Sequence, residues 1–225
     1  MGRGGFEPPK ALGQLIYSQS RLTTSVSARP GDSTDNRLVE KARWVVWEGL
    51  ADPSFERCNL LQSASGWTLS GLILRATRDA AYVARYAIEL DDRWHTKTVE
   101  VELENGAKRR LRIEREEAGR WLIDGRPEIG LERCVDVDLE WTPATNTLPI
   151  RRLSLQPGAV EWVTAAWVRF PSLEIEPLHQ SYERVDDRRY QYRAGDFTAD
   201  LETDEDGVVT QYGGGWRAVA SGPPA

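Results

Sequence analysis

The chain has 225 residues, of which 40% are hydrophobic and 28% are charged, as is typical of a soluble globular protein. Its formal net charge of −6 disfavours nucleic acid and anionic membrane surfaces as partners. No apolar run approaches the ~20 residues that a transmembrane helix needs, so we expect no membrane span.

The first 40 residues differ from the rest of the chain. They are rich in Ser, Thr, Gly, Pro and Arg and show no regular apolar period, so we expect a disordered N-terminal extension over 1–40. We expect a single β domain over 41–220 and a frayed tail over 221–225. Because no basic start precedes an apolar segment at the N-terminus, the sequence predicts no secretory signal and a cytoplasmic location.

From residue 42 onward, short segments with alternating apolar and polar residues predict strands almost everywhere. The predicted strands cover residues 42–48, 55–61, 67–76, 81–90, 94–103, 108–115, 120–123, 134–141, 160–170, 178–185, 189–193, 197–203 and 208–212. The pairs Asn105-Gly106 and Asp206-Gly207 favour tight hairpin turns, in which both central residues need a positive φ.

This pattern predicts the fold class. No amphipathic segment of helical length carries convincing caps, whereas about a dozen strands follow one another along the chain. We therefore expect an all-β fold with one large antiparallel sheet, curved into a barrel or half-barrel because closure removes exposed edges. The same order of elements occurs over residues 100–125 and 198–218: a strand, a tight turn, a second strand and a segment with Gly and Trp. The fold could therefore consist of two similar halves.

Motifs for common catalytic and cofactor chemistry are missing from the sequence. The two histidines and two cysteines show no metal-ligand spacing, and neither a nucleophile elbow nor a phosphate-binding glycine loop is present. We therefore expect no metal and no cofactor. Cys58 and Cys134 are expected to be reduced thiols, with a disulfide as the less favoured alternative.

The predicted strand over 134–141 carries acids at alternate positions, namely Asp136, Asp138 and Glu140. Side chains of a strand alternate between its faces, so the three acids share one face. Like charges this close need compensation. They form structural ion pairs, contact the polar part of a ligand, or serve as the paired carboxylates of a glycosidase-like hydrolase.

A proline-bounded segment and two arginines follow this strand. Asn146 lies between Pro143 and Pro149, where it either caps a turn or donates to a ligand. If residues 150–155 form the next strand, alternation makes Arg152, not Arg151, the partner of Asp138 or Glu140.

The nine tryptophans favour either a β-sheet core or the wall of a cavity for an apolar or sugar-bearing ligand. Trp162 and Trp167 lie five residues apart on one predicted strand. They therefore point to opposite faces, and at most one of them lines a given pocket.

Several segments together resemble a bacterial family described as "putative glycolipid-binding". They are residues 47–50, 53–58, 66–67, 119–121, 124–125, 134–138, 142–152, 165–168 and 170–171. The resemblance covers about residues 43–216, and the segment 142–152 is its longest motif. It implies a β-barrel-like fold and the binding of a glycolipid or similar lipid.

These observations lead to one functional hypothesis with two rivals. We expect non-catalytic binding of a lipid or glycolipid-like amphiphile in a concave site, with the apolar part on aromatic faces. The candidate ligand-binding residues are Arg57, Asp136, Asp138, Glu140, Asn146, Arg152, Trp162 and Trp167. The rivals are a carboxylate-dependent hydrolase acting on a sugar or sugar-lipid, and a scaffold without a small-molecule site. The oligomeric state stays open.

Overall fold

The computed structural model of the protein describes residues 39–223. The extension predicted over 1–40 lies outside this range except for its last two residues, which belong to the first strand. The tail predicted over 221–225 lies outside it except for its first three residues, two of which end the last strand. The remainder of the described chain is almost entirely β-sheet.

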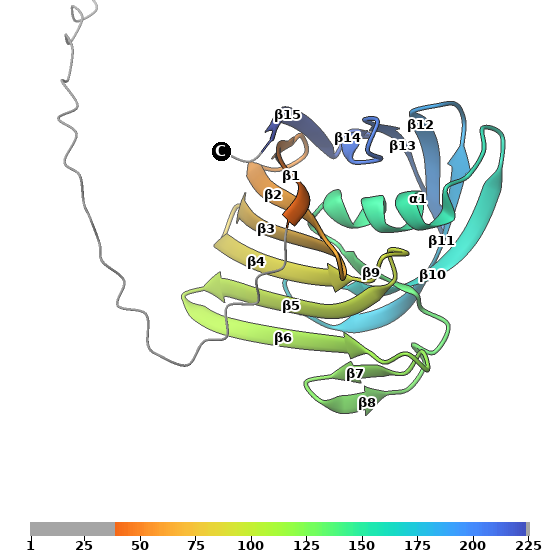
Figure 1. Cartoon of the computed structure of the whole chain (residues 1–225). Helices are drawn as coiled ribbons and strands as arrows, with labels where there is room; N and C mark the ends of the chain where they lie inside the picture. The colour runs from red at the N-terminus through yellow and green to blue at the C-terminus, as the bar shows by residue number, and fades with distance from the viewer. Residues whose placement is uncertain (1–38, 224–225) are drawn as a thin grey trace, which may run out of the picture. The chain divides into compact units, whose positions relative to one another are not determined.

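Within residues 39–223, fifteen strands form one sheet (Figure 1). The first eight are β1 (Val39–Gly49), β2 (Ser54–Ser63), β3 (Gly66–Ala76), β4 (Ala81–Leu90), β5 (Thr96–Asn105), β6 (Ala107–Arg115), β7 (Trp121–Ile123) and β8 (Arg126–Glu128). The other seven are β9 (Asp136–Leu139), β10 (Val160–Val168), β11 (Ile175–Arg184), β12 (Arg189–Ala194), β13 (Phe197–Thr203), β14 (Val209–Tyr212) and β15 (Trp216–Gly222).

The sheet topology is two meanders joined side by side. On one side of β1, strands β2 to β8 lie next to one another in chain order. On its other side, strands β15 to β9 lie next to one another in reverse chain order. Every pair is antiparallel except β9 with β10. Strand β15, which the sequence pattern did not reveal, joins the meanders by pairing with β1. The predicted all-β, largely antiparallel fold is confirmed.

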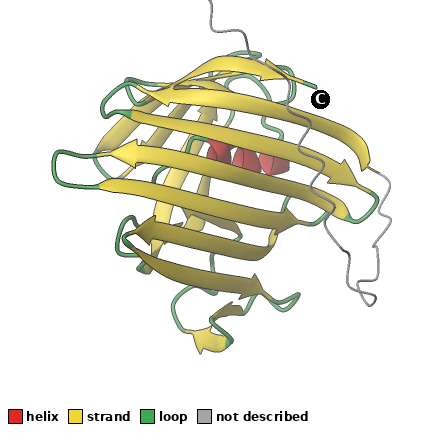
Figure 2. Cartoon of the chain, turned by 90° about the vertical axis from the view of Figure 1, so that its left-hand side faces the viewer, coloured by secondary structure: helices red, strands yellow, loops and turns green. Residues whose placement is uncertain are grey.

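The sheet curls strongly without closing, as Figures 1 and 2 show. Its end strands, β8 and β9, do not pair with each other. Instead, the backbone N–H of Val137 in β9 donates to the hydroxyl of Thr96 at the start of β5, at 3.1 Å. This contact brings the end of the second meander against the inner side of the first, so the fold is a half-barrel.

The segment before β10 corrects one prediction. A 3₁₀ turn (Ala144–Asn146) leads into helix α1 (Thr147–Leu153), so the strand expected over 150–155 is wrong. The helix lacks a side-chain N-cap, which is why no cap signal marked it. Pro149 fits its first turn, where the backbone N–H has no intrahelical partner. Burial of its first four residues, not propensity, stabilises this short helix.

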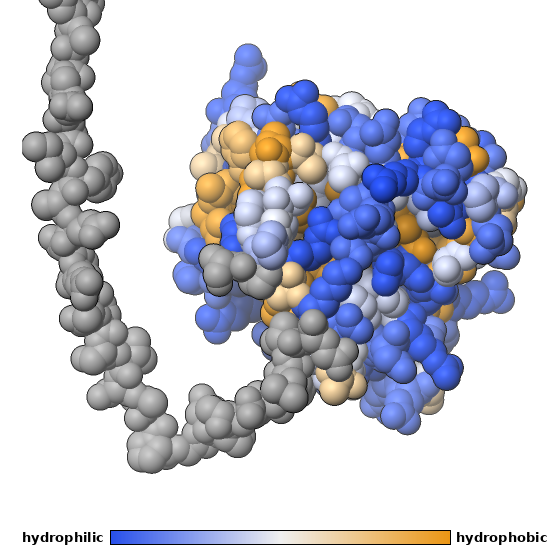
Figure 3. Space-filling view, turned by 45° about the horizontal axis from the view of Figure 1, so that its top comes forward, coloured by the Kyte–Doolittle hydropathy of each residue, from blue (hydrophilic) through white to orange (hydrophobic). Residues whose placement is uncertain are grey.

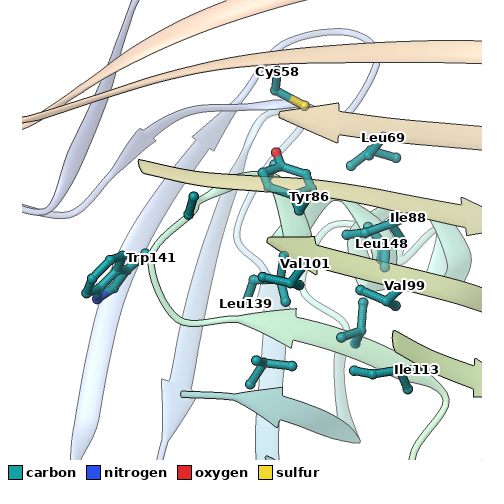
Figure 4. Close-up of a cluster of buried hydrophobic side chains, with 14 of the residues drawn as sticks. Cys58, Leu69, Tyr86, Ile88, Val99, Val101, Ile113, Leu139, Trp141 and Leu148 are labelled. Atoms are coloured by element: carbon teal, nitrogen blue, oxygen red, sulfur yellow. The ribbon is translucent and has the colours of Figure 1, made fainter. Parts of the chain in front are cut away.

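Helix α1 lies on the concave side of the sheet and packs in two directions (Figures 1 and 2). Leu148 joins a large apolar cluster on the inner faces of β1 to β6 and β9, part of which Figure 4 shows. Ile150 joins a second cluster, rich in tyrosine, on β11 to β14. The helix therefore fills the curve of the sheet and contacts both meanders.

The face shown in Figure 3 is mostly hydrophilic, with smaller apolar patches. Cys58 and Cys134 are both buried free thiols. Within residues 39–223, no helix has the length and apolar character needed to cross a membrane.

Candidate functional site

A cavity of about 360 Å³ lies between the β9 segment and the concave side of strands β10 to β15. It is lined by Asp138, Leu139, Glu140, Thr142, Pro143, Asn146, Trp167, Leu178, Tyr192, Ala194, Phe197, Tyr212 and Trp216. Depressions of about 520 and 700 Å³ elsewhere are more open and are lined mainly by charged and polar side chains. We consider the 360 Å³ cavity the candidate site because it combines enclosure, an aromatic wall and a few polar groups.

Aromatic side chains from five different strands form much of the cavity wall. Trp167, Tyr192, Phe197, Tyr212 and Trp216 come from β10, β12, β13, β14 and β15, respectively. The Phe197 and Tyr212 rings stack with their centroids 6.3 Å apart, and Tyr192 lies 6.1 Å from each of them. Phe197 remains 52% exposed, which places it at the cavity rim.

Asp138 supplies the enclosed carboxylate of the cavity. Its Oδ1 accepts a hydrogen bond from the Thr145 hydroxyl at 2.9 Å, and its Oδ2 accepts one from the Gln180 side-chain amide at 2.5 Å. Burial raises the pKa of Asp138, and the neighbouring charges of Asp136 and Glu140 act in the same direction. The two described hydrogen-bond donors to this carboxyl group are therefore both neutral.

Asp136 is engaged in a buried ion pair. The Arg152 guanidinium donates to its two oxygens from Nε at 3.0 Å and from Nη2 at 2.5 Å, and the Asp136 side chain is only 2% exposed. Arg152 thus meets Asp136, not Asp138 or Glu140 as the strand prediction implied. The helical path of residues 147–153 places Arg152 over the start of β9, and the bidentate pair fixes α1 to that strand.

Glu140 and Asn146 also line the cavity. Glu140 is exposed, and its Oε2 accepts the Phe170 backbone N–H at 2.6 Å. Asn146 is buried. Its Oδ1 accepts the Tyr182 hydroxyl at 2.9 Å, and its Nδ2 donates to the Pro143 carbonyl at 3.4 Å. Asn146 therefore holds the turn before α1 and a cavity wall at the same time.

The two candidate tryptophans lie on opposite faces of β10. Trp167 lines the cavity, whereas Trp162 is 68% exposed on the other face. Arg57 is also exposed, because its β2 neighbours Glu56 and Cys58 point inward. Of the eight candidate residues, the structure thus gathers Asp138, Glu140, Asn146 and Trp167 around one cavity. It places Asp136 with Arg152 beside that cavity, and Arg57 and Trp162 away from it.

Sequence reasoning did not select several residues of the site. These are Gln180, Tyr192, Phe197, Tyr212 and Trp216. The alternation of Tyr190 and Tyr192 in β12 was a usable signal for an inward aromatic face. The others come from separate strands, so only the curvature of the sheet brings them together.

A buried hydrogen-bonded cluster around the carboxyl group of Glu56 lies behind the cavity wall. Glu56 accepts hydrogen bonds at Oε1 from the Tyr86 hydroxyl at 2.5 Å and from the Thr142 hydroxyl at 2.8 Å, while its Oε2 has no hydrogen-bond partner among the described residues. Burial raises the pKa of Glu56 to about 8. Gly71 leaves room for Tyr86, since a Cβ there would lie 2.4 Å from its ring. Because Thr142 lines the cavity, this cluster supports one of its walls.

Comparison with known proteins agrees with this architecture. A family model described as "Putative glycolipid-binding" matches residues 44–218. The chain belongs to this family. A crystal structure of a DUF1089 family protein from Pseudomonas aeruginosa is 28% identical and superimposes with a TM-score of 0.64, covering 71% of this chain and 88% of that one. The resemblance seen in the sequence is therefore confirmed.

A second solved structure is more distant. It is a β-barrel-like protein of the DUF1849 family from Brucella abortus, 8% identical, with a TM-score of 0.47 over 84% of this chain and 99% of that one. No curated protein matches the chain.

Proposed function

We propose that this protein binds a lipid or glycolipid-like amphiphile in the 360 Å³ cavity without chemically changing it. The observation that carries the proposal is that one cavity combines a largely aromatic wall with a few polar groups, those of Asp138, Glu140 and Asn146. The volume lies within the ~300–1,000 Å³ typical of small-molecule sites. The membership of a glycolipid-binding family supports the same ligand class.

The aromatic wall suits the apolar part of such a ligand. Trp167, Leu178 and Trp216 present apolar surface, and each buried CH₂ group contributes roughly 0.8 kcal/mol to binding. Affinity should therefore rise with alkyl-chain length until the cavity is full. Asp138, Glu140 and Asn146 offer hydrogen-bonding atoms to the polar head, which orients the ligand.

A cavity-filling variant tests the proposal. Ala194 lines the cavity, so Ala194→Trp should fill it and abolish binding of dodecyl maltoside, measured by isothermal titration calorimetry below the critical micelle concentration. The matched control is Ala87→Trp, on the outer side of β4, which should leave binding unchanged. Equal binding by both variants and the unchanged protein would contradict the proposal.

The same ligands distinguish binding from hydrolysis. If Asp138 and Glu140 are an acid–base pair, the protein releases free sugar from alkyl glycosides, and Asp138→Asn abolishes that release. A binding protein returns the glycoside intact after prolonged incubation. Mass spectrometry of the incubated ligand gives the answer directly, and turnover would replace our proposal by the hydrolase hypothesis.

We propose further that the protein works in the cytoplasm. The support is the pair of buried free thiols, Cys58 and Cys134, which suits a reducing compartment. Fractionation of the native host with an antibody against the protein tests this location, and recovery from the periplasm or medium would contradict it.

A further inference from the structure

We infer that the carboxylates of the cavity, Asp138 and Glu140, select a head group that carries a positively charged nitrogen. This inference rests on the proposed function, because it concerns the same cavity and specifies the class of amphiphile. It arises from the unequal distribution of charge around the cavity and from the geometry of its aromatic wall.

The charged side chains of the cavity wall have one sign. Among the described residues that line it, Asp138 and Glu140 are acidic, and none is Lys, Arg or His. The nearby arginines have partners of their own. Arg152 pairs with Asp136, while Arg169 packs over the Trp167 ring at 5.0 Å and pairs with Glu176 at 3.6 Å. An anionic head group would therefore meet two carboxylates without a compensating cation in the wall.

Asp138 itself calls for a cation. Asp138 is half-buried, and a carboxylate that loses part of its hydration is stabilised by a nearby positive charge or by sufficient hydrogen bonds. Its protein partners, the Thr145 hydroxyl and the Gln180 amide, are both neutral. A ligand ammonium group placed against Asp138 supplies the missing charge, whereas a neutral sugar hydroxyl supplies only one more neutral hydrogen bond.

The aromatic residues of the wall favour the same chemistry. The faces of Trp and Tyr rings attract cations. Proteins commonly bind a quaternary ammonium group by surrounding it with several such rings. Tyr192, Phe197 and Tyr212 form a contiguous group with centroids 6.1 to 6.3 Å apart. Rings and carboxylates line one cavity, so a cationic head group gains from both.

Four amphiphiles with the same twelve-carbon tail test the inference. They are dodecylamine, dodecyltrimethylammonium, dodecyl maltoside and dodecyl sulfate, each titrated calorimetrically at pH 7 below its critical micelle concentration. We expect at least one cationic ligand to bind roughly ten-fold tighter than the maltoside, equivalent to about 1.4 kcal/mol. The sulfate should bind most weakly. Tighter binding of dodecylamine would indicate a hydrogen-bonding amine such as an amino sugar, and tighter binding of the quaternary ligand would indicate a choline-like group.

The variant Asp138→Asn separates charge from shape. It should reduce the affinity for the cationic ligand roughly ten-fold. The affinity for the maltoside should fall by a clearly smaller factor, because that ligand loses a hydrogen-bond acceptor but no opposite charge. Retained maltoside binding shows that the variant is folded with its cavity intact. Asp187→Asn, at an exposed loop position, is the matched control and should change neither affinity.

The outcomes separate the inference from the proposed function. Maltoside or sulfate binding tighter than both cations would overturn the inference and leave the amphiphile cavity standing. Equal losses for the cation and the maltoside in Asp138→Asn would also overturn it, because the carboxylate would then act without regard to ligand charge. Failure of all four ligands to bind would remove the proposed function as well.

Discussion

The two meanders of this sheet use their concave sides differently. In β1 to β8, which we call the filled half, aliphatic side chains such as Leu69, Ile88 and Val99 pack into a continuous core (Figure 4). In β9 to β15, which we call the cavity half, tyrosines, tryptophans and carboxylates leave about 360 Å³ between the strands and the turn before α1. One half therefore supplies stability and the other supplies a site.

The difference follows from side-chain chemistry. Branched aliphatic side chains interdigitate to crystal-like density, because they have no polar atoms to satisfy. Tyr182 and Asn146 must place their polar atoms within hydrogen-bonding distance, and this requirement restricts how closely the surrounding strands and turn pack.

The largest expected effect concerns the ion pair that ties α1 to β9. Arg152→Ala should lower the free energy of unfolding by about 3–5 kcal/mol, because it leaves Asp136 buried without its partner. The control is Arg120→Ala, which removes an exposed pair with Glu116 and should cost about 1 kcal/mol or less. Urea denaturation measures both. Equal small losses would mean that this pair does not join helix and sheet.

The next effect compares the two halves directly. Ile88 is fully buried in the filled half, so Ile88→Ala should cost about 2–5 kcal/mol of stability without changing ligand affinity. Phe197 is half exposed at the cavity rim, so Phe197→Ala should cost about 1 kcal/mol or less and weaken amphiphile binding. The reverse pattern would refute the division into a filled half and a cavity half.

The buried carboxyl group between the halves should make stability depend on pH. The pKa of Glu56 is about 8 in the folded protein, against an ordinary value of 4.5. Between these values the folded state holds a proton that the unfolded state has lost, so the free energy of unfolding falls as pH rises. The limiting slope is about 1.4 kcal/mol per pH unit.

The variant Glu56→Gln isolates this effect, because glutamine does not titrate. Its stability should fall less between pH 5 and 8 than that of the unchanged protein, as measured by urea denaturation at each pH. Glu100→Gln, at an exposed outer position, serves as the control and should keep the original slope. Parallel profiles for all three proteins would show that Glu56 is not the titrating group.

The smallest effect tests the alternation along β10. Trp162→Ala should change stability by about 0.5 kcal/mol or less and leave ligand affinity unchanged, because its side chain is exposed on the outer face. Trp167→Ala, five residues later on the cavity face, should weaken amphiphile binding. Intrinsic fluorescence titration of the two variants provides the comparison. Similar losses in both would contradict the assignment of faces.

Local patterns in the sequence were sufficient for the class of fold. Alternation and turn pairs such as Asn105-Gly106 identified most strands, since each depends on neighbouring residues alone. Alternation also placed Asp136 and Asp138 on one face of β9 and separated Trp162 from Trp167 on β10. The family resemblance rested on the same local motifs.

Tertiary structure decided the rest, because contacts between distant residues have no local signature. Residues 147–153 are helical through burial in the curve of the sheet, although no cap marks them in the sequence. That helix determines that Arg152 neutralises Asp136 and leaves Asp138 facing the cavity. The pairing of β15 with β1 and the curvature of β10 to β15 then bring Tyr192, Tyr212 and Trp216 together. The sequence by itself therefore determined most strands and the alternation of their faces, whereas the enclosed site exists only through long-range packing.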